Sequence, residues 1–279
     1  MIFFTIFIKP EKKIEVYPMK KISPPPLPRE HGAWGIIGGA FLAAIVYSKS
    51  INIPQVFLLV SILFFYISRV SFFNLIRGKR KQQEHLWFPV LAMGGWLSLL
   101  ACAYFSQYWM ILLWSLVMLP FLIIEILLVK KRKQMSFLAQ LLGTIGLTTL
   151  TPLTLILHQQ KLTAMAVFLW FIVSLFFISG ILFVRYQISA MKNTSDFRTY
   201  HLGMIIFHLS LLLFLFGLQF VTEDALTWII AFTPMFLQNL YFLVTRSHIR
   251  SLRKIGWLQI GHMIIFLLVL TVMLKNPPH

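Results

Sequence analysis

The chain has 279 residues, of which 58% are hydrophobic and 12% are charged, yet its formal net charge is +17. Soluble globular domains average about 45–50% apolar and about 25% charged residues, and a folded core of this size cannot hide so much apolar surface. The composition therefore excludes an ordinary soluble domain and indicates a polytopic membrane protein. The single cysteine, Cys102, lies inside an apolar stretch, so an intramolecular disulfide and a cysteine-based metal cluster are also excluded.

Residues 1–32 are predicted to form a cytoplasmic amino-terminal segment that precedes one transmembrane domain over residues 33–279. The apolar stretch Met1–Ile8 is too short to span a bilayer, and it lacks the basic start and the small-residue cleavage site of a signal peptide. Met19 is followed by two lysines, as at an ordinary cytoplasmic start. We therefore hypothesise that translation begins at Met19 and that residues 1–18 are a start-site artefact.

Nine apolar stretches follow in chain order, each long enough, or nearly so, to cross a bilayer as a helix of about 20 residues. They are Ala33–Tyr47, Val56–Ile76, Leu86–Phe105, Tyr108–Val129, Phe137–Leu157, Leu162–Val184, Leu202–Val221, Ala225–Val244 and Trp257–Leu274. Backbone groups in lipid must be paired within the segment, and these runs are too long and too uniform for barrel strands. The sequence predicts an all-α integral membrane protein with about nine transmembrane helices.

The positions of the basic residues predict the orientation of these helices. If the nine stretches alternate in direction, 22 of the 25 basic residues lie on one side, and only Lys49, Lys161 and Lys275 lie on the other. The positive-inside rule then places the amino terminus in the cytoplasm and the carboxyl terminus outside, in a bacterial cell membrane. Anionic lipids of the cytoplasmic leaflet are the expected partners. Nucleic acid is not expected, because short membrane-bound loops divide the charge.

A dense polar and aromatic cluster stands at the first membrane entry: Arg29, Glu30, His31 and Trp34. One interpretation is structural, with the arginine and the tryptophan as interfacial anchors and the glutamate near a helix amino terminus. The alternative is that the cluster folds over the cytoplasmic mouth of a cavity and contacts a ligand.

Three polar residues near the predicted cytoplasmic ends of the second and sixth stretches are further ligand-binding candidates: Arg69, Asn74 and Arg185. The structural interpretation is that the arginines extend toward lipid headgroups. The alternative is that the three side chains hold an anionic group inside the bundle, because guanidinium groups suit phosphate and carboxylate.

Glu125, His208 and His262 are the other ionisable candidates at membrane depth, where such groups are costly and usually face the protein interior. For Glu125, a salt bridge to an arginine or lysine on a neighbouring helix competes with a proton-handling role. For the histidines, hydrogen-bonded packing competes with haem ligation from two helices. No metal site is predicted, and we expect no cofactor.

The segment Pro28 to Gly35 (PREHGAWG) resembles the opening signature of the YwiC-like family of bacterial membrane proteins. Weaker similarities are Ser136-Phe137-Leu138, Phe207-His208-Leu209 and Ile255-Gly256-Trp257. The sequence departs from the family pattern at Gln140 and Gln259, where the resemblance leads us to expect an Asp and a Glu. The family is uncharacterised, so the resemblance implies a membrane location more than a mechanism.

The nine-helix arrangement is also similar to that of UbiA-type prenyltransferases, which bind Mg²⁺ and a prenyl diphosphate through Asp-rich motifs. Here the corresponding positions hold Arg69, Asn74, Arg77, Arg185 and Gln187, with no aspartate. That reaction is therefore not expected, although arginine recognition of an anionic or isoprenoid head is consistent with the residues.

The function predicted from these features is binding, and potentially processing, of an amphipathic, lipid-like molecule in a cavity open to the cytoplasm. Whether the protein is an enzyme is left open by the sequence. A transporter of small molecules or ions and a haem- or quinone-associated membrane protein are the alternatives.

Overall fold

The computed structural model describes residues 24–28, 31–78, 82–192, 196–222 and 225–273. Within these ranges the chain forms helices and their connections, and none of the described residues lies in a strand. The hypothesis about Met19 and the candidates Arg29 and Glu30 fall outside the described residues. His31 begins the first helix, but its side chain is also outside the description.

Eight helical segments are long and apolar enough to cross a membrane, so the prediction of a multi-pass, all-helical protein is confirmed. They are α2 (Ile53–Ile76), α3 (Gln82–Ser106), α4 with α5 (Met110–Ser115, Leu119–Lys130), α6 with α7 (Phe137–Thr148, Leu150–Gln159), α8 (Ala164–Lys192), α9 (Phe197–Gly217), α10 (Ala225–Thr245) and α11 (Leu252–Met273). The first predicted stretch is also a helix, α1 (His31–Ser48), but its apolar part is shorter than that of the others.

Two predicted stretches are interrupted where the sequence analysis expected continuous helices. A 3-10 turn over Leu116–Met118 separates α4 from α5, and Pro120 stands in the first turn of α5. The second break, at Thr149, comes three residues before Pro152. Proline has no N–H to donate and its ring clashes with the carbonyl four residues earlier, so each proline disturbs the turn that precedes it.

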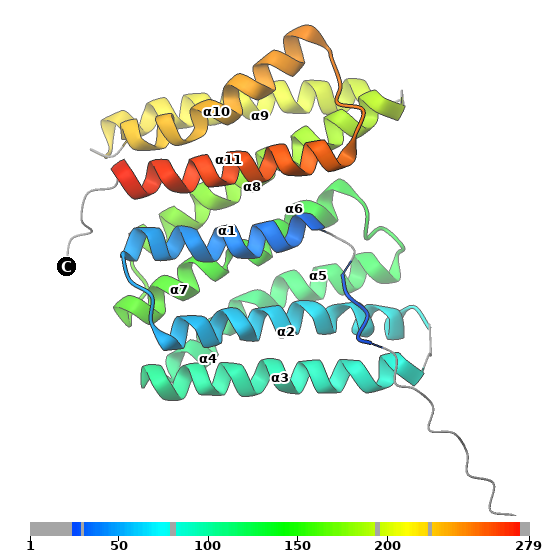
Figure 1. The fold of residues 1–279 in the computed structure, drawn as a ribbon, viewed down its shortest axis with the longest axis vertical. Coiled ribbons are helices and arrows are strands. Elements are labelled where there is room, and N and C mark those ends of the chain that lie inside the picture. Colours follow the sequence, from blue (N-terminus) through cyan, green and yellow to red (C-terminus); the bar gives the residue numbers. More distant parts are fainter. Residues whose placement is uncertain (1–23, 29–30, 79–81, 193–195, 223–224, 274–279) are drawn as a thin grey trace, which may run out of the picture.

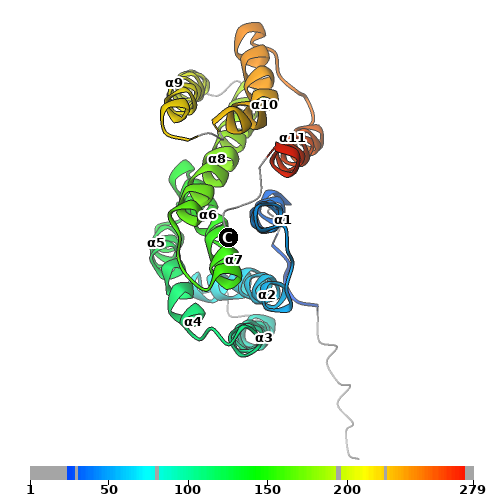
Figure 2. The ribbon, with the colours of Figure 1, turned by 90° about the vertical axis from the view of Figure 1, so that its left-hand side faces the viewer.

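The helices run side by side and are stacked along the long axis of the molecule, with α9 to α11 at one end of the stack and α2 and α3 at the other (Figure 1). Viewed along the helices, α1 lies at a height between α11 and α2, beside α6 and α7 (Figure 2). It packs against α6, α7, α8 and α11, and the Thr151 hydroxyl of α7 donates to the Ala40 carbonyl at 3.0 Å. The first helix therefore links α11 to the helices in the middle of the stack.

Connections that carry basic residues gather at one end of the helices. The ends of α2, α5, α8 and α10 lie at the right in Figure 1, with the beginnings of α1, α3, α6, α9 and α11. Exposed basic side chains at this end include Lys131, Arg132, Arg198, Arg250 and Arg253. We call this the basic end. Lys49 and Lys161 lie at the opposite end.

The outer surface of α9 shows why these helices suit lipid. Its large exposed side chains recur every three or four residues, on one stripe of the helix. They are Leu202, Ile206, Leu209, Leu213 and Phe216. Exposing a continuous apolar stripe of this kind to water is unfavourable, whereas contact with lipid hydrocarbon chains carries no such penalty.

Gly39 marks the closest approach of α1 to its neighbours and generates a prediction. A Cβ atom there would lie 2.6 Å from the Phe177 ring of α8 and 2.7 Å from the Met263 sulfur of α11. At Gly38 a Cβ would meet nothing within 4 Å. Alanine at either position gains about 1 kcal/mol of helix propensity, but at position 39 overpacking costs about 1–3 kcal/mol.

We therefore expect the Gly39→Ala variant to have a melting temperature several degrees below that of Gly38→Ala. The melting temperature of Gly38→Ala should equal or exceed that of the wild-type chain. Thermal unfolding of the purified protein in detergent measures both. Equal melting temperatures for the two variants would contradict the close packing of α1.

Candidate functional site

Arg69 and Glu125 form an ion pair between α2 and α5. The Arg69 Nε donates to Glu125 Oε2 at 2.9 Å, and Nη2 contacts Oε1, so the carboxylate is held by two nitrogens. The guanidinium also lies over the Tyr66 and Phe73 rings, at 5.7 and 5.0 Å from their centres. This is the salt-bridge interpretation of Glu125, and it balances the charge of Arg69 within the protein.

The other candidates near this pair lie on α1 and α2. Asn74 is half-buried, one turn beyond Arg69 along α2. Trp34 packs the edge of its ring against Tyr66, with ring centres 5.4 Å apart. The tryptophan therefore contributes to the contact between α1 and α2.

Arg185 is held at a corner between α6, α8 and α9, away from the partner helix of Arg69. Its Nε donates to Gln140 Oε1 at 2.7 Å, Nη1 to the Tyr200 hydroxyl at 2.6 Å, and Nη2 to the Met135 carbonyl at 2.6 Å. The guanidinium also lies over the Phe137 and Tyr200 rings, at 5.8 and 5.6 Å from their centres. The sequence analysis singled out Arg185 and Gln140 separately; the structure brings them together.

The charge of Arg185 is not balanced by these partners. All three hydrogen-bond acceptors are neutral, and no carboxylate among the described residues forms an ion pair with it. A guanidinium has five N–H groups, and three are used here. The other two N–H groups have no described hydrogen-bond acceptor, and the charge has no described carboxylate beside it.

A second polar cluster connects α8, α9 and α10, farther from the basic end than Arg185. His208 Nε2 lies 2.8 Å from Ser179 Oγ and 2.6 Å from Asn239 Nδ2, and Nδ1 lies 2.6 Å from the Met204 carbonyl. Ser179 is fully buried, Asn239 is 1% exposed and His208 is 7% exposed. The sequence analysis found His208 but missed Ser179 and Asn239, although an asparagine after Gln238 within an apolar stretch was a usable signal.

The partners of His208 define its tautomer. A carbonyl only accepts, so Nδ1 carries the proton that is donated to Met204. In the neutral ring Nε2 is then the acceptor, and Asn239 and Ser179 can both donate to it. Because both ring nitrogens are engaged, His208 offers no free nitrogen to a haem iron.

His262 is half-buried on α11, which packs on α8 and α10. No described contact joins it to His208, so haem ligation by this pair has no support. Among the described residues, no group of three or more His, Cys, Asp or Glu side chains is placed to hold a metal ion.

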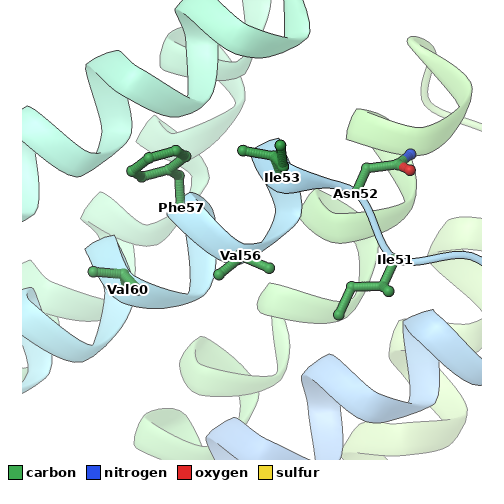
Figure 3. Close-up of a pocket in the computed structure, with 6 residues that line it drawn as sticks. All are labelled: Ile51, Asn52, Ile53, Val56, Phe57 and Val60. Atoms are coloured by element: carbon green, nitrogen blue, oxygen red, sulfur yellow. The ribbon is translucent and has the colours of Figure 1, made fainter.

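An apolar hollow of about 410 Å³ lies at the start of α2 (Figure 3). It is lined by Ile51, Asn52, Ile53, Val56, Phe57 and Val60. This place is at the end of the helices opposite the basic connections. The hollow is therefore separate from the cavity that the sequence analysis expected beside Arg69, Asn74 and Arg185.

A family model described as YwiC-like protein matches residues 27–155. The match begins just before the opening signature and runs into α7, which covers just under half of the chain. The predicted resemblance to the YwiC-like family is confirmed over these residues. No curated protein and no solved structure matches the chain, so the similarity to UbiA-type enzymes has no support.

The ion pair between Arg69 and Glu125 generates a prediction about stability. Removing one partner leaves the other charge in an apolar setting, whereas removing both leaves none. Breaking a fully buried pair costs about 3–5 kcal/mol. The side chains here are 24% and 18% exposed, so we expect about 1–3 kcal/mol for Arg69→Met or Glu125→Gln.

The double variant should lose less unfolding free energy than the sum of the two single losses, because the two side chains interact directly. Thermal or denaturant unfolding of the four proteins in the cycle measures this coupling. Additive losses would show that the two groups act independently.

Proposed function

We propose that this multi-pass protein lies in the bacterial cytoplasmic membrane with its basic end inside. The support is the gathering of basic residues at that end, because positive loops are retained in the cytoplasm. With α1 as a ninth crossing, the amino terminus is cytoplasmic and the carboxyl terminus is outside. Anionic lipids of the cytoplasmic leaflet are then the immediate surroundings of the basic end.

We further propose that the protein binds an amphipathic lipid by its anionic head at Arg185. The observation that carries this function is the unbalanced charge of Arg185, held among three neutral acceptors. Guanidinium groups bind phosphate and carboxylate through paired N–H donors. The three protein contacts fix the direction of the guanidinium, so little side-chain entropy is lost when the head binds.

Arg185 suits this role better than Arg69, which the sequence analysis placed beside it. Arg69 shares two contacts with the Glu125 carboxylate, and an anionic head would have to compete with that carboxylate. The partner of Arg185 at the equivalent position is the neutral Gln140. The two arginines thus have different roles: one stabilises the contact of α2 with α5, and the other accepts a ligand.

Two variants test this function with little change in shape. Arg185→Gln removes the charge, and Gln140→Glu places a carboxylate beside Arg185 in a side chain of the same length. We expect each to reduce the anionic lipid retained by the purified protein at least threefold. Native mass spectrometry and lipid extraction, after reconstitution with phosphatidylglycerol, measure the retained lipid.

Lys161→Gln is the matched control, because Lys161 is an exposed cation at the opposite end. It should retain as much lipid as the wild-type chain. If Gln140→Glu and Arg185→Gln also retain wild-type amounts, the head does not bind at Arg185 and the proposal fails.

A further inference from the structure

Ser179 and His208 have the arrangement of a nucleophile with its base. The hydroxyl oxygen lies 2.8 Å from the ring Nε2, within the range of a direct hydrogen bond. A serine is a weak nucleophile until an adjacent base removes its proton, and that base must itself be oriented by a third group. Here the third group is the Met204 carbonyl, which accepts from Nδ1 at 2.6 Å.

The tautomer set by Met204 is the one that this chemistry requires. With the proton on Nδ1, the lone pair of Nε2 is an acceptor that the Ser179 hydroxyl at 2.8 Å shares with the Asn239 amide at 2.6 Å. Because Met204 and His208 are one turn apart on α9, the helix itself fixes the ring. The Phe207 and Phe236 rings pack against the imidazole in an edge-to-face arrangement, with ring centres 5.3 and 5.6 Å from its centre, so the imidazole has little freedom to turn.

Asn239 supplies an amide donor beside the nucleophile. Its Nδ2 lies 3.3 Å from Ser179 Oγ and 2.6 Å from His208 Nε2. The amide has two N–H groups, and these two contacts hold the serine and the imidazole next to each other. The three residues come from α8, α9 and α10, so the packing of these helices assembles the set.

We propose that Ser179, His208 and Asn239 form an acyl-transfer site for a carboxylic ester of an amphipathic lipid. The substrate class rests on the head binding proposed at Arg185. Ser179 and Arg185 are six residues apart on α8, about 9 Å along its axis. Both contact α9, through His208 and Tyr200. A lipid whose head is held at Arg185 would have to place its ester carbonyl about 9 Å farther along α8 to meet Ser179.

The reaction balances with water as the second substrate. Ser179 Oγ attacks the ester carbonyl carbon while its proton moves to His208 Nε2. The carbon–oxygen bond to the alcohol then breaks, and the alkoxide takes that proton from His208. Water next attacks the acyl-serine, gives a proton to His208, and releases the fatty acid when the proton returns to Ser179.

A long-chain fluorophosphonate without an anionic head tests the chemistry on the full chain in membranes. It reacts with an activated serine by losing fluoride, and peptide mass spectrometry locates the adduct. We expect an adduct on Ser179 in the wild-type protein, none at that position in Ser179→Ala, and at least tenfold slower labelling in His208→Gln. A folded wild-type protein without an adduct on Ser179 would overturn the proposal.

Ser174 is the matched control on the same helix. It is buried and its hydroxyl lies 2.7 Å from that of Thr148, with no histidine as a described partner. Ser174→Ala should label as fast as the wild-type chain. Equal labelling of His208→Gln, checked for a wild-type melting temperature, would also overturn the proposal, because the serine would then react without its base.

The Arg185→Gln variant separates this inference from the proposed lipid binding. The probe carries no anionic head, so labelling of Ser179 in the wild-type chain and lipid retention in the variant are independent readouts. If Ser179 is labelled but Arg185→Gln retains as much lipid as the wild-type chain, only the proposal of head binding at Arg185 fails. If Arg185→Gln loses lipid retention but Ser179 of the wild-type chain is not labelled, only the proposal of acyl transfer at Ser179 fails.

Discussion

The cost of placing polar groups in hydrocarbon governs this structure. Backbone groups must be paired within each segment, which selects helices, and charged side chains must be paired, moved to an end or put to use. The described spans meet this demand in three ways. Arg69 is paired with Glu125, most cations lie at the basic end, and His208 is enclosed by Ser179 and Asn239.

The contrast between the two half-buried arginines, Arg69 and Arg185, follows from the same cost. Glu125 neutralises Arg69 through two contacts, and the pair links α2 to α5. Arg185 instead receives neutral oxygens from Gln140, Tyr200 and the Met135 carbonyl. These oxygens accept hydrogen bonds from the guanidinium but do not neutralise its positive charge. An unneutralised charge is tolerated only close to lipid headgroups and water. Such a position suits a ligand that brings its own negative charge.

The sequence predicted the apolar helices well and the partners of their polar side chains poorly. Hydropathy located all eight helical segments that are long and apolar enough to cross a membrane, because a long apolar run has no other stable environment. It could not show that α4 and α5 are separated near Pro120, since a proline can also be accommodated in a continuous membrane helix. Nor could it identify Ser179 and Asn239 as partners of His208, because that depends on which helices are neighbours and how each is rotated.

The residue at position 140 connects the departure from the family pattern with the proposed function. The YwiC-like resemblance leads to an aspartate there, and an aspartate beside Arg185 would neutralise it, as Glu125 neutralises Arg69. Gln140 keeps an oxygen acceptor at 2.7 Å from the guanidinium and removes the negative charge. Gln140 therefore keeps the contact between α6 and α8 without adding a carboxylate beside the arginine. In the proposed binding mode, the charge of Arg185 holds the head of a lipid whose ester lies at the depth of Ser179.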